Sequence, residues 1–294
     1  MNKAYFKYLL ALILFGSNGV VANYIHLSSF EIVLLRSVLG SILLVGLFFL
    51  TGNKITAHKY KKDLLFIVLS GLAMAADWLF LFEAFNQIGV SLTILINYSG
   101  PAIVIALSPI LFNEKVTSKK IIGLIAALIG VFLISGVAIT NGLNTWGIIC
   151  AVLSAFSYAA MVIFNKKSEK VKGIENSTLQ LFSALLIVAI FVGIKQGYSM
   201  NIAAGDWIPI LWLGFLNTGI ACLLYFSSIG ELPVQTVAIS SYIEPVSAVF
   251  FSVTLLNEKL LPLQILGAVL VLGGAAYAEG LINFKIPGEG QFTK

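Results

Sequence analysis

The sequence is poor in charge. Only 11% of its 294 residues are Asp, Glu, Lys or Arg, whereas 59% are hydrophobic, and the mean hydropathy is +0.99. A soluble domain carries a charged fraction of about 25%. No soluble core could bury this much apolar surface in a chain of this length, so the composition indicates an integral membrane protein. The net charge of +5 is then no argument for a nucleic-acid partner.

Residues and motifs for chemistry are also scarce. The two cysteines, Cys150 and Cys222, lie inside apolar runs, which favours packing over a disulfide or a metal site. The phosphate-binding motif G-x-x-x-x-G-K-[ST] is absent, as is H-E-x-x-H, and no loop could hold a nucleotide-binding domain. His26 and His58 lie at loops or helix ends. We therefore expect no enzyme activity, no cofactor and no metal.

Long apolar runs dominate what remains. About 20 residues of helix are needed to cross the hydrocarbon core, and continuous rather than alternating runs exclude strands. The first run follows two lysines as a signal peptide would, but it is better explained as the first membrane helix. The sequence predicts an all-α membrane protein with ten transmembrane helices, at 7–24, 30–50, 64–85, 90–112, 118–137, 146–164, 178–195, 207–228, 234–256 and 261–282.

An eighteen-residue segment occurs twice. Tyr98–Lys115 and Tyr242–Lys259 align at an offset of 144, which pairs Pro101 with Pro245 and matches the Asn-Glu-Lys ends. The register continues downstream, with 12 identities in 39 residues and three glycines in step. Upstream, Ile88-Gly89 is paired more loosely with Ile229-Gly230. This internal repeat predicts two five-helix units, at 1–140 and 141–284, followed by a short cytoplasmic tail at 285–294.

The repeat unit contains an odd number of helices, so its second copy should enter the membrane inverted. Lysines support one orientation, because 15 of them fall on one side and only Lys195 and Lys259 on the other. Both termini are therefore expected in the cytoplasm. The expected location of the protein is the plasma membrane. Two inverted repeats favour alternating access, with a binding site near the midplane between them.

The repeat carries a family resemblance. Proline followed by twelve residues and Glu-Lys, at 101–115 and 245–259, and then G-x(6)-G, resemble EamA-type exporters of the drug/metabolite transporter superfamily. The resemblance extends over essentially the whole chain. It implies a central cavity lined by spans one to four and six to nine, with spans five and ten at the periphery. It also implies export of small metabolites, often amino acids.

Three charged residues lie deep within the predicted spans, away from their ends, where each charge is costly and needs a reason. Glu244 is interpreted either as a cavity carboxylate for a cation or proton, or as a neutral buried acid. Asp77, beside Trp78, either contacts the substrate or forms an ion pair with Arg36. Arg36 either extends towards the headgroups or binds a substrate carboxylate.

Neutral polar and aromatic residues recur at similar depths. They are candidates for the cavity wall, although each could also bond neighbouring helices. Two prolines at equivalent positions are candidate hinges. The predicted wall residues are Asn18, Asn97, Tyr98, Tyr158, Asn217 and Tyr242, and the predicted hinges are Pro101 and Pro245.

These features predict a secondary transporter that exports small organic metabolites, either amino-acid-like or cationic and zwitterionic. A channel-like or lipid-handling protein, a non-transporting scaffold, and a nucleotide-sugar or sugar-phosphate exchanger are the alternatives. The exchanger is disfavoured because a phosphate site near the midplane calls for several Lys or Arg, and Arg36 is the only basic residue away from the ends of the spans. The expected partners are a small molecule and the lipid bilayer. The sequence leaves open the substrate, coupling to protons, and a monomer or homodimer.

Overall fold

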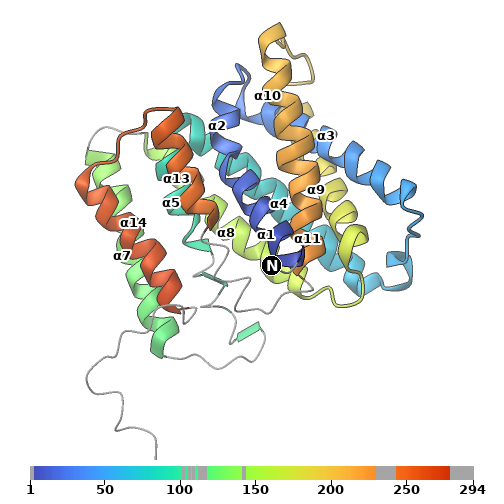
Figure 1. Ribbon diagram of the computed structural model, residues 1–294, viewed down its shortest axis with the longest axis horizontal. Helices are drawn as coiled ribbons and strands as arrows, with labels where there is room; N and C mark the ends of the chain where they lie inside the picture. Colours follow the sequence, from blue (N-terminus) through green and yellow to red (C-terminus); the bar gives the residue numbers. More distant parts are fainter. Residues whose placement is uncertain are drawn as a thin grey trace, which may run out of the picture.

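The computed structural model describes residues 3–100, 103–104, 107, 110–111, 118–140, 144–229 and 243–278. These residues form helices and connecting segments without a strand (Figure 1). The predictions that concern Pro101, Tyr242, the segment 113–115 and the tail 285–294 lie outside them.

The helices follow the apolar runs of the sequence. In the first half they are α1 (Lys3–Gly16), α2 (Asn18–Asn23), α3 (Ser29–Leu50), η1 (Ala57–Lys59), α4 (Lys61–Ile88), α5 (Val90–Asn97) and α7 (Ser118–Thr140). In the second half they are α8 (Thr145–Lys166), α9 (Gly173–Lys195), η2 (Ala204–Asp206), α10 (Trp207–Leu211), η3 (Trp212–Ile220), α11 (Ala221–Ile229), α13 (Ile243–Leu255) and α14 (Pro262–Ala278).

Six helical segments among the described residues are long and apolar enough to cross a membrane. They are Lys3–Asn23, Ser29–Leu50, Lys61–Ile88, Thr145–Lys166, Gly173–Lys195 and Ala204–Tyr225. Shorter apolar helices at Ile121–Gly130, Ile243–Leu255 and Pro262–Gly274 lie within three more of the predicted runs. The chain is thus a multi-pass membrane protein, and the count of ten spans stays a prediction.

Among the described residues, the first predicted span and the run at 207–228 are not continuous α-helices, and α5 likewise ends at Asn97 inside the run at 90–112. The first is broken at Ser17, whose hydroxyl donates to the Leu14 carbonyl at 2.8 Å, so that α1 ends and α2 begins. The run at 207–228 contains nine residues of π-helix, η3, between α10 and α11. Within η3 the Thr218 hydroxyl donates to the carbonyl of Leu213, five residues earlier. Such wide turns inside helices frequently occur at functional sites.

The 144-residue offset also holds between α3 and α9, where the sequence had suggested a looser match. Each helix begins with a glutamate, Glu31 or Glu175, in its first turn. In α3 the Arg36 Nε donates to Thr218 in η3 at 2.9 Å, and in α9 the Gln180 amide lies 3.6 Å from the Met74 sulfur in α4. Gln180 and Thr218 are 144 residues from Arg36 and Met74, respectively. The same contact is therefore built twice, with different residues.

The helices α7 and α14 pack against each other at one edge of the molecule (Figure 1). A Cβ added to Gly130 in α7 would lie 2.6 Å from the carbonyl oxygen of Gly267 and 2.8 Å from a Val271 methyl in α14. No larger side chain fits without moving one helix away from the other. Close packing of α7 against α14 therefore depends on this glycine.

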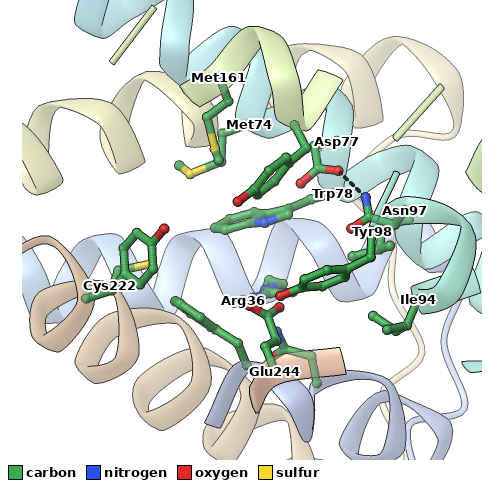
Figure 2. Close-up of a pocket in the computed structure, with 15 residues that line it drawn as sticks. Arg36, Met74, Asp77, Trp78, Ile94, Asn97, Tyr98, Met161, Cys222 and Glu244 are labelled. Carbon is green, nitrogen blue, oxygen red and sulfur yellow. Dashed lines mark hydrogen bonds between the residues drawn. The ribbon is translucent and has the colours of Figure 1, made fainter. Parts of the chain in front are cut away.

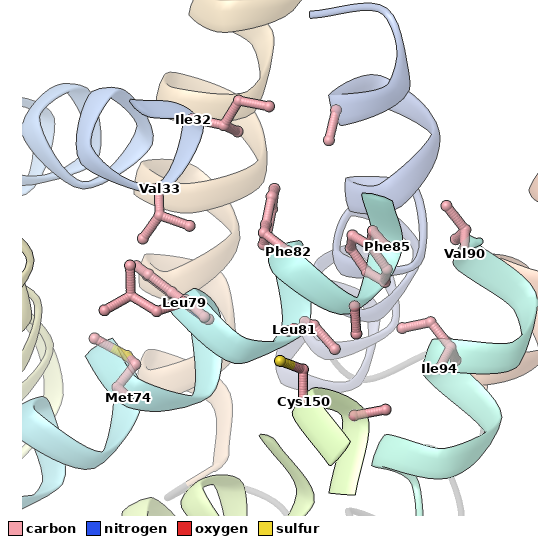
Figure 3. Close-up of a cluster of buried hydrophobic side chains, with 14 of the residues drawn as sticks. Ile32, Val33, Met74, Leu79, Leu81, Phe82, Phe85, Val90, Ile94 and Cys150 are labelled. Atoms are coloured by element: carbon pink, nitrogen blue, oxygen red, sulfur yellow. The ribbon is translucent and has the colours of Figure 1, made fainter. Parts of the chain in front are cut away.

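The apolar core surrounds α4. Leu79, Leu81 and Phe82 of α4 belong to one buried cluster with Val33 of α3, Ile94 of α5 and Cys150 of α8 (Figure 3). Cys150 is fully buried and is a free thiol, consistent with a packing role. The helix α4 is thus held on several sides, and this fixes the positions of the polar residues that project from its middle.

Candidate functional site

A cavity of about 90 Å³ lies among helices from both halves of the chain (Figure 2). Space of this size is enough for several water molecules. The first half contributes Phe15, Asn18, Arg36, Met74, Asp77, Trp78, Leu81, Ile94, Asn97 and Tyr98, and the second half contributes Tyr158, Met161, Cys222, Tyr225 and Glu244.

Apart from the two hinges, ten site residues were predicted, and the cavity brings together eight of them: Asn18, Arg36, Asp77, Trp78, Asn97, Tyr98, Tyr158 and Glu244. Asn217 is not among them. Its amide donates to the Leu14 carbonyl at 2.9 Å and to the Ser17 hydroxyl at 2.8 Å, so it bonds the break between α1 and α2. Tyr242 lies outside the described residues.

Asp77 projects from the middle of α4 and is buried. Ser154 of α8 donates to its Oδ1 at 2.7 Å, and the Asn97 amide donates to the same oxygen at 3.3 Å (Figure 2). No ion pair joins Asp77 to Arg36 in the part of the chain that the structure describes. The alternative in which Asp77 merely ties α4 to α3 by an ion pair is therefore wrong. Its partners are neutral groups of α5 and α8.

Arg36 is 1% exposed and does not extend towards the headgroups. Its guanidinium carbon lies 4.3 Å from the centre of the Trp78 ring and 4.8 Å from that of Phe82. The Nε donates to Thr218 across the interface with η3. The headgroup interpretation is wrong because α3 turns this side chain towards α4 and η3 instead of towards the surface.

Glu244 approaches the cavity from α13, and its side chain lies beside Tyr98 at the end of α5 (Figure 2). Close packing brings α1 to the same place, because a Cβ on Gly16 would lie 2.9 Å from the Glu244 carbonyl oxygen. Tyr225 of α11 lines the same cavity, and its ring centre lies 5.4 Å from that of Tyr8 and 5.7 Å from that of Phe15 in α1. The carboxylate therefore shares the cavity with tyrosines of both halves.

The contact between α5 and α13 continues from the cavity to the far ends of both helices. There Glu258 accepts hydrogen bonds from the backbone N–H groups of Val90 at 2.7 Å and Ser91 at 2.8 Å. Ser91 also bonds the hydroxyl of Ser252. The sequence had suggested only that Asn-Glu-Lys ends a span. Its glutamate also caps the first turn of α5, which joins the two halves on one side of the cavity.

Sequence reasoning missed seven lining residues: Phe15, Met74, Leu81, Ile94, Met161, Cys222 and Tyr225. Six are apolar or aromatic side chains that nothing in an apolar run distinguishes from packing residues. The seventh, Cys222, had been interpreted as packing only. The repeat offers a signal, because Cys222 and Tyr225 lie 144 residues after Trp78 and Leu81, which also line the cavity.

Comparison with known proteins agrees with this architecture. The model of the EamA-like transporter family matches residues 2–136 and 145–278. The chain is 27% identical to the uncharacterized transporter YxxF of Bacillus subtilis, over 94% of this chain and 89% of the relative. It is 30% identical to a probable amino-acid metabolite efflux pump of Escherichia coli, over 68% of this chain and 71% of the pump.

The fold also occurs among solved structures. One crystal structure superposes with a TM-score of 0.68 at 18% identity, covering 95% of this chain and 96% of the other. At that identity the likeness concerns the fold alone. The family match extends over nearly the whole chain in two parts, and it indicates a transporter rather than an enzyme. The protein belongs to the EamA-like transporter family.

Proposed function

We propose that the protein is a secondary carrier that exports small organic compounds bearing an amine, such as amino-acid-like zwitterions or organic cations, by alternating access. The observation that carries the proposal is one cavity that holds Asp77 from the first half and Glu244 from the second. A charge buried among apolar helices is costly unless a partner compensates it. A cationic ligand is a suitable partner for two such carboxylates.

The arrangement around the cavity supports a carrier more than a pore. Interrupted helices that surround a binding site are typical of alternating-access transporters, and α1–α2 is broken beside Asn18. In this proposal the halves 1–140 and 141–284 move against each other around the cavity. The Escherichia coli relative named as a probable amino-acid metabolite efflux pump supports the choice of ligand class.

The two carboxylates have different surroundings, which suggests different roles. Asp77 accepts hydrogen bonds from Ser154 and Asn97 and is held in place by both. We assign it to the amine of the ligand. Glu244 lies beside Tyr98 of the opposite half at the cavity, so its protonation would alter a contact between the halves (Figure 2). We assign it to proton coupling.

Proteoliposomes containing the purified protein test the proposal. A carrier should show saturable uptake and exchange of a labelled amine or amino acid. Asp77→Asn should weaken ligand binding by roughly 1.5–3 kcal/mol, the usual worth of a hydrogen bond to a charged group. Glu83→Gln is the matched control, because Glu83 lies on the same helix outside the cavity and accepts from Ser29. Unsaturable flux would indicate a pore, and normal binding by Asp77→Asn would remove Asp77 from the ligand site.

A further inference from the structure

Arg36 is the only arginine in the chain and lines the cavity. It is 1% exposed, and its Nη1 has no hydrogen-bond partner. No carboxylate forms an ion pair with it among the described residues. A buried guanidinium with an unused donor at a cavity needs an explanation, because native proteins rarely leave such groups unpaired.

The contacts that Arg36 makes among the described residues are all with neutral groups. Its guanidinium lies over the rings of Trp78 and Phe82, and its Nε donates to Thr218. These contacts hold the guanidinium in position, but none of them supplies an opposite charge at hydrogen-bond distance. Because removing an ion from water is costly, a buried charge is best compensated by a hydrogen-bonded partner of opposite charge. An anion in the cavity would supply that partner.

The repeat shows that the fold does not require a charge here. The equivalent position in the second half is Gln180, which is also fully buried. Its carbonyl accepts from the Asn165 amide at 2.6 Å, and its own amide lies near the Met74 sulfur. Gln180 does not line the cavity. A neutral amide is therefore sufficient for packing at this position of the repeat. The two halves differ here in that only the first has a charged side chain, and only that side chain lines the cavity.

We propose that the Arg36 guanidinium is the subsite for the carboxylate of the transported compound. The inference rests on the proposed function, because it names the acidic end of the same ligand. The guanidinium presents planar donors that match a carboxylate in two-point geometry. At the cavity wall the Oδ1 of Asn18 is likewise unpaired, and Asp77 and Glu244 supply negative charge. The site is complementary to a small zwitterion with one acid group and one amine.

The single arginine makes a direct test practicable. The diketone 2,3-butanedione condenses with guanidinium groups, so mass spectrometry of the labelled wild-type protein reports on Arg36 alone among arginines. The probes are alanine, leucine and phenylalanine, each paired with the amine that lacks its carboxyl group: ethylamine, 3-methylbutylamine and 2-phenylethylamine. At roughly ten times its dissociation constant, a ligand that covers the guanidinium should slow labelling about tenfold.

We expect at least one amino acid to protect Arg36 and its paired amine to protect much less. Equal protection by both members of every pair would overturn the proposal, because it would mean that filling the cavity is enough. Protection by none of the three amino acids would overturn it too. So would a failure of Arg36 to react in the ligand-free protein, since a guanidinium that no small molecule can reach cannot bind a substrate.

Arg36→Gln provides the second measurement, with the residue that the second half uses at this position. The variant should bind the amines as well as the wild type does and should lose its preference for the amino acids. Arg36→Lys should restore only part of that preference, because an ammonium lacks the planar fork. An unchanged preference in Arg36→Gln would contradict the subsite.

The failures of the two proposals are distinguishable. If amino acids protect Arg36 but no probe crosses a proteoliposome membrane, the carboxylate subsite stands and the transport proposal fails. If amines are carried in a saturable manner but amino acids do not protect Arg36, the carrier stands and the subsite fails.

Discussion

Replacing Glu258 by glutamine should open one side of the cavity. The carboxylate of Glu258 accepts from the backbone N–H groups of Val90 and Ser91, and it ties the end of α13 to the first turn of α5. Gly89 allows this approach, since it has φ +82° and a Cβ there would lie 2.9 Å from the Glu258 Oε1. On the predicted topology this contact faces outward, so its loss should favour the state that is open to the outside.

The size of the effect follows from the two bonds. Glutamine keeps one acceptor oxygen but loses the charge, so about one charge-assisted hydrogen bond disappears, worth roughly 1.5–3 kcal/mol. Because about 1.4 kcal/mol corresponds to a factor of ten, the ratio of open to closed molecules should rise about 10- to 100-fold. The adjacent bond between Ser91 and Ser252 remains and keeps the effect near the lower figure.

Cys222 is a built-in reporter for this opening. It lines the cavity, whereas the other cysteine, Cys150, is buried in the core and can be replaced by alanine. In that background we expect an impermeant cationic thiosulfonate, added outside intact cells, to modify Cys222 faster in Glu258→Gln. Glu175→Gln is the control, because Glu175 makes similar bonds to Thr56 and Ala57 within another part of the structure. Equal rates of Cys222 modification with Glu258 and with Glu258→Gln would refute the idea that Glu258 holds this side of the cavity closed.

Three further results are expected. In intact cells an impermeant thiol reagent should label Asn141→Cys and leave Lys172→Cys unlabelled, and the reverse would overturn the predicted orientation. If the prolines are hinges, Pro101→Ala and Pro245→Ala should slow flux more than they weaken equilibrium binding, because a continuous helix bends less easily; normal flux in both would reduce them to packing residues. Glu244→Gln mimics the protonated acid, so liposomal transport measured across about pH 5.5 to 8 should lose its pH dependence while binding persists. A wild-type profile would make Glu244 a neutral structural acid.

The sequence was sufficient for the family and for much of the cavity wall. A charged residue inside a membrane helix costs free energy and so stands out in the sequence. Arg36, Asp77 and Glu244 could therefore be selected as candidate site residues without knowledge of their neighbours in the fold. The sequence alone could not predict the direction in which each of these side chains faces. The small residues Ser37, Gly40 and Ser41 share the buried face of α3 with Arg36, but they do not show where so long a side chain extends. The headgroup interpretation could be discarded only from the packing against η3.

Other features depend on contacts between distant parts of the chain. Glu258 caps a helix that begins 168 residues earlier, and no local pattern connects the two. The break at Ser17 and the π-helix in η3 each contain only a few polar or glycine residues within a long apolar run, so a search for spans passes over them. Both are backbone irregularities that hydrogen bonds from Asn217 and Thr218 help to stabilise. Composition decides that a helix crosses the membrane, whereas these bonds decide where it is interrupted.

The charges of the cavity break the symmetry of the repeat. The residues 144 positions from Arg36 and Asp77 are Gln180 and Ala221, both neutral. Both charged residues that the first half contributes to the cavity therefore have neutral counterparts in the second half, although the surrounding helices correspond. The scaffold does not demand either charge.

Glu244 shows the same relation in the opposite direction. Its counterpart in the first half is Gly100, where an added Cβ would lie 2.8 Å from the Tyr158 ring and 2.9 Å from the Ala155 carbonyl oxygen. That position cannot hold a carboxylate, because α8 already occupies the space. A duplicated fold that needed an acid for its own stability would have room for one in both copies. The acid at Glu244 is thus specific to one wall of the cavity, and its cost in stability is better explained by a ligand or a proton than by the packing of the helices.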